Sequence, residues 1–381
     1  MRIHAPEIVR HDGRLRLSAP VESSGISGTA WFDVPGECAD WVIPGRSDGF
    51  LAGLVLQAMA LGEDVFVDGV ISPTLLEHLN ASAIPLVAAF NPRLGRIRIH
   101  ADLVEAPQSA GTAVATGFSA GVDSFATLIR HHDRESRPER RITHLLFNNA
   151  GSHGTGEKSR ILYARRLAKV APFAAERGIP LLSVDSNIHE ILPIDFIQMH
   201  SALNAAVPLV LQGGIGRFHY SSTYACPDCG IGLDPGFDIA RIDPSLIHLF
   251  STETTSFESS GGDLTRVDKT RLVAECPDSE RYLSVCADPD GDGGNCSECF
   301  KCRRTMLTLE LLGVADRFRN AFDFSKFDKV RGRYIASLAF APRHSFSDEL
   351  AALVADSGGG FAAAFVRISR GLRLKSRQNR I

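Results

Sequence analysis

The sequence predicts an α/β fold in which a parallel sheet carries helices on both faces. Three observations support this. From residue 112 onward, buried strand patterns alternate with helical patterns. The first strand pattern of that series runs into a tight turn of small residues and then a helix. Further on, four cysteines gather at the start of a helical pattern, which predicts a separate C-terminal subregion.

The N-terminal part, residues 1–105, mixes short alternating segments with two helical patterns, which predicts a small α/β domain of unassigned role. The first helix is expected from Asp48 to a stop at Gly62. The second follows Ser72, with Pro73 at its first position. A linker is expected after Ala106 because small residues, Pro and Gly dominate there.

The central part, residues 112–285, predicts the main domain. After the first strand and helix, a second strand is expected at Thr143–Asn149 and a third at Ile179–Asp185. A helix ending at Gly178 lies between them, and a helix near 198–212 and a strand near 218–224 follow. Since such alternation produces parallel strands, a ligand crevice is expected at their carboxyl ends.

The turn Ser119-Ala120-Gly121 lets the backbone approach a ligand closely, and the first amides of the next helix have no intrahelical acceptor. Such a helix start binds anions. The other interpretation is an ordinary turn, in which Ser119 caps the helix and Asp123 complements its dipole.

Asn148 and Asp185 end the second and third strands and are expected at the same edge of the sheet. Either side chain could hydrogen-bond an adenine or a ribose. Either could equally cap the loop that follows it.

The spacing Cys286-x9-Cys296-x2-Cys299-x2-Cys302 places four thiols within seventeen residues and runs into a helix. A loop and a first helical turn can bring four sulfurs to about 2.3 Å from Zn²⁺. Because no coordination position is left open, residues 286–320 are expected to form a structural zinc site. Unrelated buried or redox-active cysteines are the alternative.

A second pair, Cys226-Pro-Asp228-Cys229, allows a metal half-site, a redox pair or simple packing, and we favour a place near the substrate. Thr265 and Asp268 form a capping-box pattern, which puts Lys269 in the first turn of a helix, where a ligand contact would offset its unfavourable position.

Ser119-Ala-Gly-Val-Asp-Ser124 resembles the loop signature of the PP-loop ATP pyrophosphatases. With Tyr224-Ala-Cys-Pro-Asp-Cys229, Thr265-x3-Lys269 and the four-cysteine motif ending in Arg304, residues 112–313 resemble the 7-cyano-7-deazaguanine synthase family of queuosine biosynthesis. The chain departs from that family by residues 1–111, by the tail after Gly313, and by one inserted residue after Tyr224.

The resemblance implies an enzyme, a carbon–nitrogen bond-forming ligase that uses ATP to activate a carboxylate on a deazapurine-like molecule, releases AMP and pyrophosphate, and passes the acyl group to ammonia or another amine. It implies Mg²⁺ on the phosphates and zinc as a structural ion. Asp123 and Ser124 are the expected catalytic residues, with Asp123 orienting the loop or Mg²⁺ rather than acting as a base. Cys226, Asp228 and Lys269 are expected to bind the substrate. Nucleotide binding is expected from Ser119, Ala120, Gly121, Val122, Asp123, Ser124, Asn148 and Asp185.

Two other functions fit parts of the sequence. Other PP-loop enzymes thiolate RNA, and a persulfide on Cys226 or Cys229 would serve sulfur transfer. A zinc-stabilised module that keeps a nucleotide pocket without catalysis is the non-enzymatic alternative.

With 381 residues, 44% of them hydrophobic, the chain can bury a large core, and a net charge of −3 argues against bulk binding of nucleic acid. The start of the sequence lacks an apolar signal core, and the longest apolar run, Leu51–Leu61, is too short to span a bilayer, so a cytoplasmic protein is expected, and we expect a homodimer. Residues 321–381 should be helical and basic. The end, Val366–Ile381, carries six cations and no acid, which suggests contact with RNA, an acidic protein or anionic lipid, or else a frayed, solvated terminus.

Overall fold

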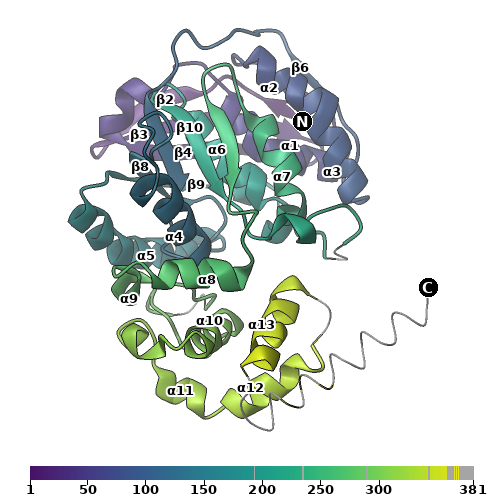
Figure 1. Ribbon diagram of the computed structural model, residues 1–381. Coiled ribbons are helices and arrows are strands. Elements are labelled where there is room, and N and C mark those ends of the chain that lie inside the picture. Colours follow the sequence, from purple (N-terminus) through teal and green to yellow (C-terminus); the bar gives the residue numbers. More distant parts are fainter. Residues whose placement is uncertain are drawn as a thin grey trace.

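The computed structural model describes residues 1–192, 194–233, 236–288, 291–341 and 344–357, and residues 364, 366 and 368 beyond them. Its strands form one sheet of eleven members in the order β11-β10-β7-β8-β9-β4-β3-β1-β5-β6, with β2 paired to β3 (Figure 1). The strands are β1 (Arg2–Ile3), β2 (Glu7–His11), β3 (Arg14–Ser23), β4 (Ile26–Pro35), β5 (Val65–Val67), β6 (Ile99–Ala101), β7 (Ala113–Gly117), β8 (His144–Asn149), β9 (Leu181–Ser186), β10 (Ile215–Ser221) and β11 (Ser256–Ser260).

The central strands β11, β10, β7, β8 and β9 are all parallel, as the alternating pattern predicted. The chain moves from β7 to β8 to β9 in one direction and then returns to place β10 on the other side of β7. The strand order therefore reverses between β7 and β10. In open α/β sheets this reversal opens a crevice at the carboxyl ends of the two strands, where ligands bind.

The sheet does not end at the linker expected after Ala106. Strand β4 of the N-terminal part pairs antiparallel with β9, with Phe32 opposite Ser186 and Asp33 opposite Asp185. The Arg14 side chain ties the same seam, because it binds the Asp33 carboxylate and the Ser183 carbonyl. The division at residue 105 stays a prediction, but the N-terminal strands extend the central sheet. The sequence concealed this because pairing between distant strands leaves no local pattern.

Helices cover both faces of the central sheet, as predicted. Along β7, Ala113 and Ala115 face one hydrophobic cluster while Val114 between them faces the other. The first cluster lies under α1 and α6, and the second under α4, α5, α8 and α10. The helices are α1 (Asp48–Leu61), α2 (Pro73–His78), α3 (Ile84–Phe90), α4 (Val122–Leu128), α5 (Gly156–Arg177), α6 (His200–Val210), α7 (Asp243–Leu246), α8 (Arg266–Ala274), α9 (Ser279–Tyr282), α10 (Phe300–Leu311), α11 (Phe324–Asp328), α12 (Arg331–Leu338) and α13 (Ser345–Asp356).

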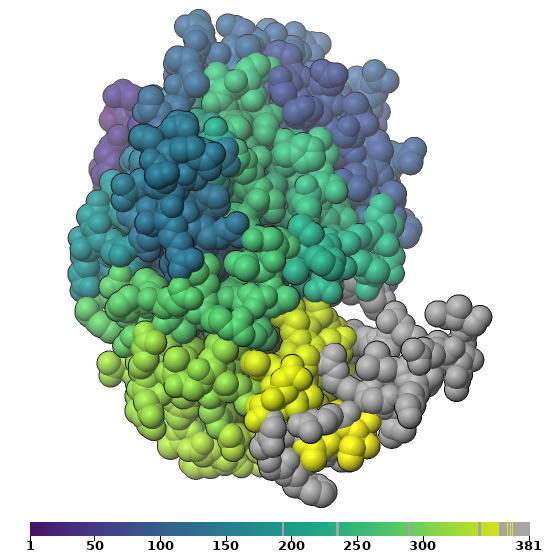
Figure 2. All heavy atoms as spheres, in the orientation of Figure 1, coloured from purple at the N-terminus to yellow at the C-terminus, as the bar shows by residue number. Residues whose placement is uncertain are grey.

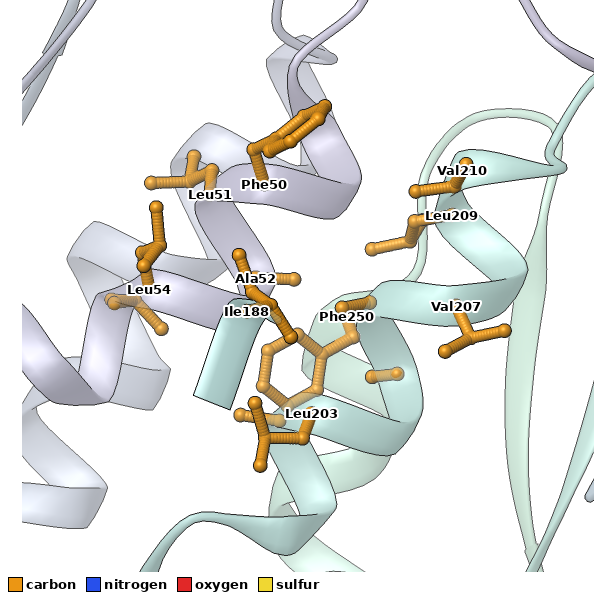
Figure 3. Packing of buried hydrophobic residues seen from close by; sticks show 14 of the residues in the cluster. Phe50, Leu51, Ala52, Leu54, Ile188, Leu203, Val207, Leu209, Val210 and Phe250 are labelled. Carbon is orange, nitrogen blue, oxygen red and sulfur yellow. The ribbon is translucent and has the colours of Figure 1, made fainter. Parts of the chain in front are cut away.

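Helix α1 packs directly on α6, so the N-terminal and central parts share one core. Figure 3 shows the apolar side chains of the two helices meeting around Ile188 and Phe250. The approach is close, because a Cβ added to Gly49 would lie 2.5 Å from Val210, and one added to Gly53 would lie 2.6 Å from Ile188. Glycine at these two positions therefore permits the contact.

The C-terminal helices α10 to α13 gather beside α8, away from the sheet (Figure 1). In the space-filling view they form the lower part of the molecule (Figure 2). Within the segment 321–381, α11, α12 and α13 are helical. Apart from Val366 and Ile368, the basic segment Val366–Ile381 lies outside the described residues.

Candidate functional site

The turn Ser119–Gly121, which we call the small-residue turn, lies at the carboxyl end of β7, where the strand order reverses. Ala120 has a left-handed backbone, with φ of 58°, and Gly121 is the N-cap of α4. The Ser124 hydroxyl donates to the Gly121 carbonyl, at 3.1 Å, and the Ser284 amide donates to the Ala120 carbonyl, at 2.8 Å. Helix α4 continues without a break into a π-helical turn, Ile129–Asp133, so the amides at its start head a helix of several turns.

Asp123, in the first turn of α4, holds two cations from α8. Its carboxylate is 2.8 Å from the Arg266 guanidinium and 3.3 Å from the Lys269 ammonium. Lys269 is buried and also donates to the Ser222 carbonyl, at 2.6 Å, just past the end of β10. Residues that follow β7 and β10 are thus joined at the point where the strand order reverses.

The electrostatics of this group follow from burial and from the ion pairs. Burial acts to raise the pKa of Asp123, but the charges of Arg266 and Lys269 outweigh it and lower that pKa. Burial lowers the pKa of Lys269, and the Asp123 carboxylate opposes this effect. Each group therefore favours the charged form of the other.

The predicted capping box at the start of α8 is present. The Thr265 hydroxyl accepts from the Asp268 amide, at 3.1 Å, and the Asp268 carboxylate accepts from the Thr265 amide, at 3.3 Å. The cap fixes the first turn of α8, where Arg266 and Lys269 lie three residues apart on one helix face. This arrangement aims both cations at Asp123.

Two further cations come from α10. The Arg304 guanidinium lies 4.3 Å from the centre of the Phe346 ring, and the Arg266 guanidinium lies 4.8 Å from the same ring. Burial lowers the pKa of Arg304 to about 10. Lys301, one helical turn earlier, keeps an exposed side. Desolvation by the neighbouring protein atoms lowers the pKa of Lys301, and so do the charges of Arg304 and Arg266.

The segment Tyr224–Cys229 lies beside Phe346 and the cations that this ring contacts. The Tyr224 ring stacks on Phe346, at 4.9 Å between ring centres, and its hydroxyl donates to the Asp238 carboxylate, at 2.8 Å. Cys226 is exposed, and its amide donates to the Gly262 carbonyl, at 2.6 Å. Gly262 follows Gly261, where an added Cβ would lie 3.1 Å from Cε of Lys269. Cys226 therefore lies in the neighbourhood of Lys269, and a place near the substrate stays a prediction.

The other two residues of this segment are less available. Burial raises the pKa of Cys229 to about 11, so this thiol stays protonated near neutral pH. Asp228 is half-buried, and its backbone carbonyl accepts from Arg241, at 2.8 Å. Burial raises the pKa of the half-buried Glu349, whose carboxylate accepts from the Val267 amide, and the charge of Asp228 adds to this effect. A substrate role for Asp228 stays a prediction.

Asn148 and Asp185 lie at the predicted edge of the sheet but are engaged with other side chains. The Asn148 amide donates to Asn204, at 3.2 Å, and the Asp185 carboxylate accepts from Asn149, at 2.7 Å. Arg160 lies 3.5 Å from Asp185. These contacts favour a role in holding neighbouring side chains in place. A contact of Asn148 or Asp185 with a nucleotide stays a prediction.

Cys286, Cys296, Cys299 and Cys302 lie together, with all four sulfurs within 4.8 Å of one another. Cys299 is the N-cap of α10 and Cys302 lies in its first turn. The donor set fits a closed tetrahedral metal site, because it offers four sulfurs and no open position. A metal such as zinc would be held by these four cysteines and would fix the start of α10.

The surroundings of the sulfurs suit thiolates. Backbone amides of Asp288 and Cys296 donate to the Cys286 sulfur, both at 3.4 Å, and the Cys299 amide donates to the Cys296 sulfur, at 3.2 Å. Burial acts to raise the pKa of Cys299, but amide donors around it outweigh this and lower the pKa to about 7. Burial raises the pKa of Cys302, so a bound cation would be needed to hold this residue as a thiolate.

Comparison of the chain with protein-family models, with characterised proteins and with solved structures returned no match. Within the part of the chain that the structure describes, no helix combines the length and the apolar character needed to cross a bilayer. The site is therefore interpreted from its own geometry.

Sequence reasoning did not assign Arg266, Lys301 or Phe346 to the site. Arg266 precedes Lys269 by three residues, and Lys301 precedes Arg304 by three, so each missed cation shares a helix face with a residue of the quoted motifs. That spacing was the available signal. Phe346 had none, because only the fold brings α13 beside α8.

Proposed function

We propose that the protein is an ATP pyrophosphatase of the PP-loop kind that adenylylates a carboxylate on a deazapurine-like substrate and transfers the acyl group to ammonia or another amine. One observation carries the proposal. The turn Ser119–Gly121 and the Asp123–Lys269 pair meet where the strand order reverses, between β7 and β10. Free amides at a helix start, next to buried cations, suit a polyphosphate.

The amides around Ser119 and Gly121 would hold the phosphates beyond the α position, and Lys269 would neutralise their charge. A carboxylate oxygen of the substrate attacks the α-phosphorus, the bond from that phosphorus to the bridging oxygen breaks, and pyrophosphate leaves with the electron pair. The amine then attacks the acyl carbon, AMP leaves, and the amine's proton passes to solvent. Positioning and charge neutralisation account for catalysis of this kind.

Mg²⁺ fits this chemistry because it shields the phosphate oxygens, and Asp123 and Ser124 offer oxygen atoms at the loop. Since the Asp123 carboxylate is engaged by Arg266 and Lys269, its role is to hold those cations and orient the loop. The four-cysteine cluster supplies shape, since a closed zinc site has no position for a substrate.

The test is to incubate the protein with Mg-ATP and 7-carboxy-7-deazaguanine, with and without ammonia, and to identify nucleotide products by mass spectrometry. AMP and pyrophosphate that depend on the carboxylate support the proposal. ADP and orthophosphate would refute it. Ser119→Ala should reduce AMP formation at least about tenfold if the loop binds the phosphates.

Sulfur transfer is retained as a second candidate because the exposed Cys226 thiol lies near Lys269. A persulfide there would serve an RNA or small-molecule acceptor. Replacing Cys226 and Cys229 together by serine separates the two candidates. AMP formation that survives the double replacement excludes sulfur transfer through these residues.

A further inference from the structure

Lys301 and Arg304 lack an anionic partner. Among the described residues, neither side chain has a hydrogen bond or an ion pair, and the Arg304 Nε atom is buried without an acceptor. Lys301 is exposed, but the Arg304 guanidinium is partly buried, and a buried charge without an anionic partner is costly, so proteins usually provide one. A ligand is the partner that this arrangement lacks.

Lys301 and Arg304 lie in the same cluster of charged residues as Asp123, Arg266 and Lys269. Lys301 and Arg304 are three residues apart on α10 and therefore share a helix face. The Phe346 ring links Arg304 to Arg266, which in turn binds Asp123. The charges of Asp123 and Arg304 also reach Lys301. Helix α10 thus brings Arg304 beside the cations that Asp123 holds at the start of α4.

The charges of the group leave a surplus. Among the described residues, Arg266, Lys269, Lys301 and Arg304 are four cations of this cluster, and Asp123 and Glu349 are two carboxylates whose charges reach Arg304 and Arg266. In their charged forms these six residues sum to +2. The charge of Arg166 also reaches Lys301 and adds to the surplus of these six residues. A single carboxylate ligand would leave one positive charge uncompensated, whereas a diphosphate bound with one Mg²⁺ carries about the charge required.

We infer that Lys301 and Arg304 of α10 form the second half of the phosphate site and bind the diphosphate end of the nucleotide, which is released as pyrophosphate. This inference rests on the proposed function, because it names the ligand of the same site. As the bond at the α-phosphorus breaks, negative charge grows on the diphosphate, and fixed cations stabilise it there.

Besides holding a structural metal, the cysteine cluster would position Lys301 and Arg304. Lys301 lies between Cys299 and Cys302, so the backbone that carries this cation is held by the metal ligands on both sides. A bound metal would fix the direction of Lys301 and Arg304 and would keep two like charges close together before the ligand arrives.

The test measures binding of inorganic pyrophosphate with Mg²⁺ to the full-length protein by calorimetry. Lys301→Ala and Arg304→Gln should each weaken binding about tenfold or more, since a hydrogen bond to a charged group is lost. Lys301 has an exposed side, so its variant should fold normally. Arg319→Gln is the matched control, because that arginine is paired with Asp316 at the surface of the same region.

Three outcomes are decisive. Selective loss in the two α10 variants, with unchanged melting temperature for Lys301→Ala and unchanged binding for Arg319→Gln, supports the inference. If Ser119→Ala weakens binding but both α10 variants bind as well as the unaltered protein, the inference fails while the proposed function stands. If the unaltered protein binds neither pyrophosphate nor ATP, both fail. Arg304→Lys adds a check, because a charge contact predicts partial retention and a purely structural role of the guanidinium predicts none.

Discussion

Asp123 holds the site together at the level of single residues. It is the carboxylate that pairs with both Arg266 and Lys269, so its negative charge offsets the repulsion between the two cations. Its loss would leave those charges uncompensated beside the small-residue turn. The residue thus stabilises the protein and positions the two cations of the proposed phosphate site.

Asp123→Asn should lower the free energy of unfolding by about 2 kcal/mol at neutral pH, because it removes one partner of largely buried ion pairs. Urea unfolding of both proteins gives this difference. Its pH dependence follows from the lowered pKa of Asp123. The stabilisation is complete above the unfolded-state pKa of about 3.9 and disappears as the pH falls through the folded-state pKa.

The difference between the two proteins should therefore stay constant from pH 8 to about pH 5 and shrink below about pH 4. A difference that disappears between pH 5 and pH 7 would mean that burial dominates over Arg266 and Lys269. The pairing of Asp123 described above would then be incorrect.

At this scale the sequence indicated part of the candidate site, and the fold brings Asp123 and Lys269 into contact. The residues Ser119, Asp123 and Lys269 were recognisable because each belongs to a short motif with a fixed spacing. Phe346 was not, since its place between Arg304 and Arg266 depends on how α13 packs, which no local pattern encodes. Asn148 and Asp185 were placed at the correct edge, but their partners were not foreseeable.

Helix α10 links the cysteine cluster to the cations at the level of elements. The purified protein should contain about one zinc ion per chain, measured by metal analysis, and Cys299→Ser should lose it. Cys276→Ser is the control, because Cys276 lies outside the cluster. Metal loss should cost about 2–4 kcal/mol of stability and should weaken pyrophosphate binding, since it releases the turn that carries Lys301.

A protein that keeps its stability and its pyrophosphate binding after complete metal removal would show that the cysteines do not order α10. Zinc retained by Cys299→Ser at full stoichiometry would show instead that the cluster is not the binding site.

The contact between α1 and α6 depends on glycine. Gly49→Ala should destabilise the protein by about 2–3 kcal/mol, because the new methyl group would lie 2.5 Å from Val210 and 2.9 Å from the Ala206 carbonyl. Gly332→Ala in α12 is the control, since no atom lies within 4 Å of its added Cβ. The control should be neutral or slightly stabilising. Equal thermal melting of both variants would argue against close packing of the two helices.

Most element boundaries were predictable because caps and periodicity are local. Gly62 and Gly178 end their helices in the left-handed conformation, as expected, and Thr265 caps α8. Strand partners were not predictable in the same way. The apolar alternation of β3 and β4 shows that each has a buried face, but not that β4 would pair with β9.

The whole molecule is organised by one sheet that runs from β11 to β6. Residues 1–105 pair with the edge of β9 and cover α6. Without them, the edge of β9 and the apolar face of α6 would be exposed to solvent. A fragment lacking residues 1–105 should therefore fail to give a cooperative thermal transition and should aggregate during size-exclusion chromatography. Co-expression with residues 1–105 as a separate chain should restore a soluble complex.

A fragment that melts cooperatively by itself at the temperature of the intact protein would show that the N-terminal part is an independent domain. The division expected at residue 105 would then be correct as a folding boundary.

At this scale the fold class and the parallel core were predictable, whereas the single continuous sheet was not. The linker after Ala106 has the composition of a domain boundary, yet the strands on its two sides meet through β4 and β9. The composition of a segment can indicate that it is a connection between elements. Which strands pair on its two sides depends on tertiary packing.

The decisive measurement is a crystal structure of the protein with Mg²⁺ and an ATP analogue that cannot be cleaved between the α and β phosphates. The expected result is a triphosphate on the amides of Ser119–Ser124, with its outer phosphates in contact with Lys269, Lys301 and Arg304. Nucleotide bound elsewhere, or a turn that stays empty at saturating analogue, would contradict the proposed phosphate site.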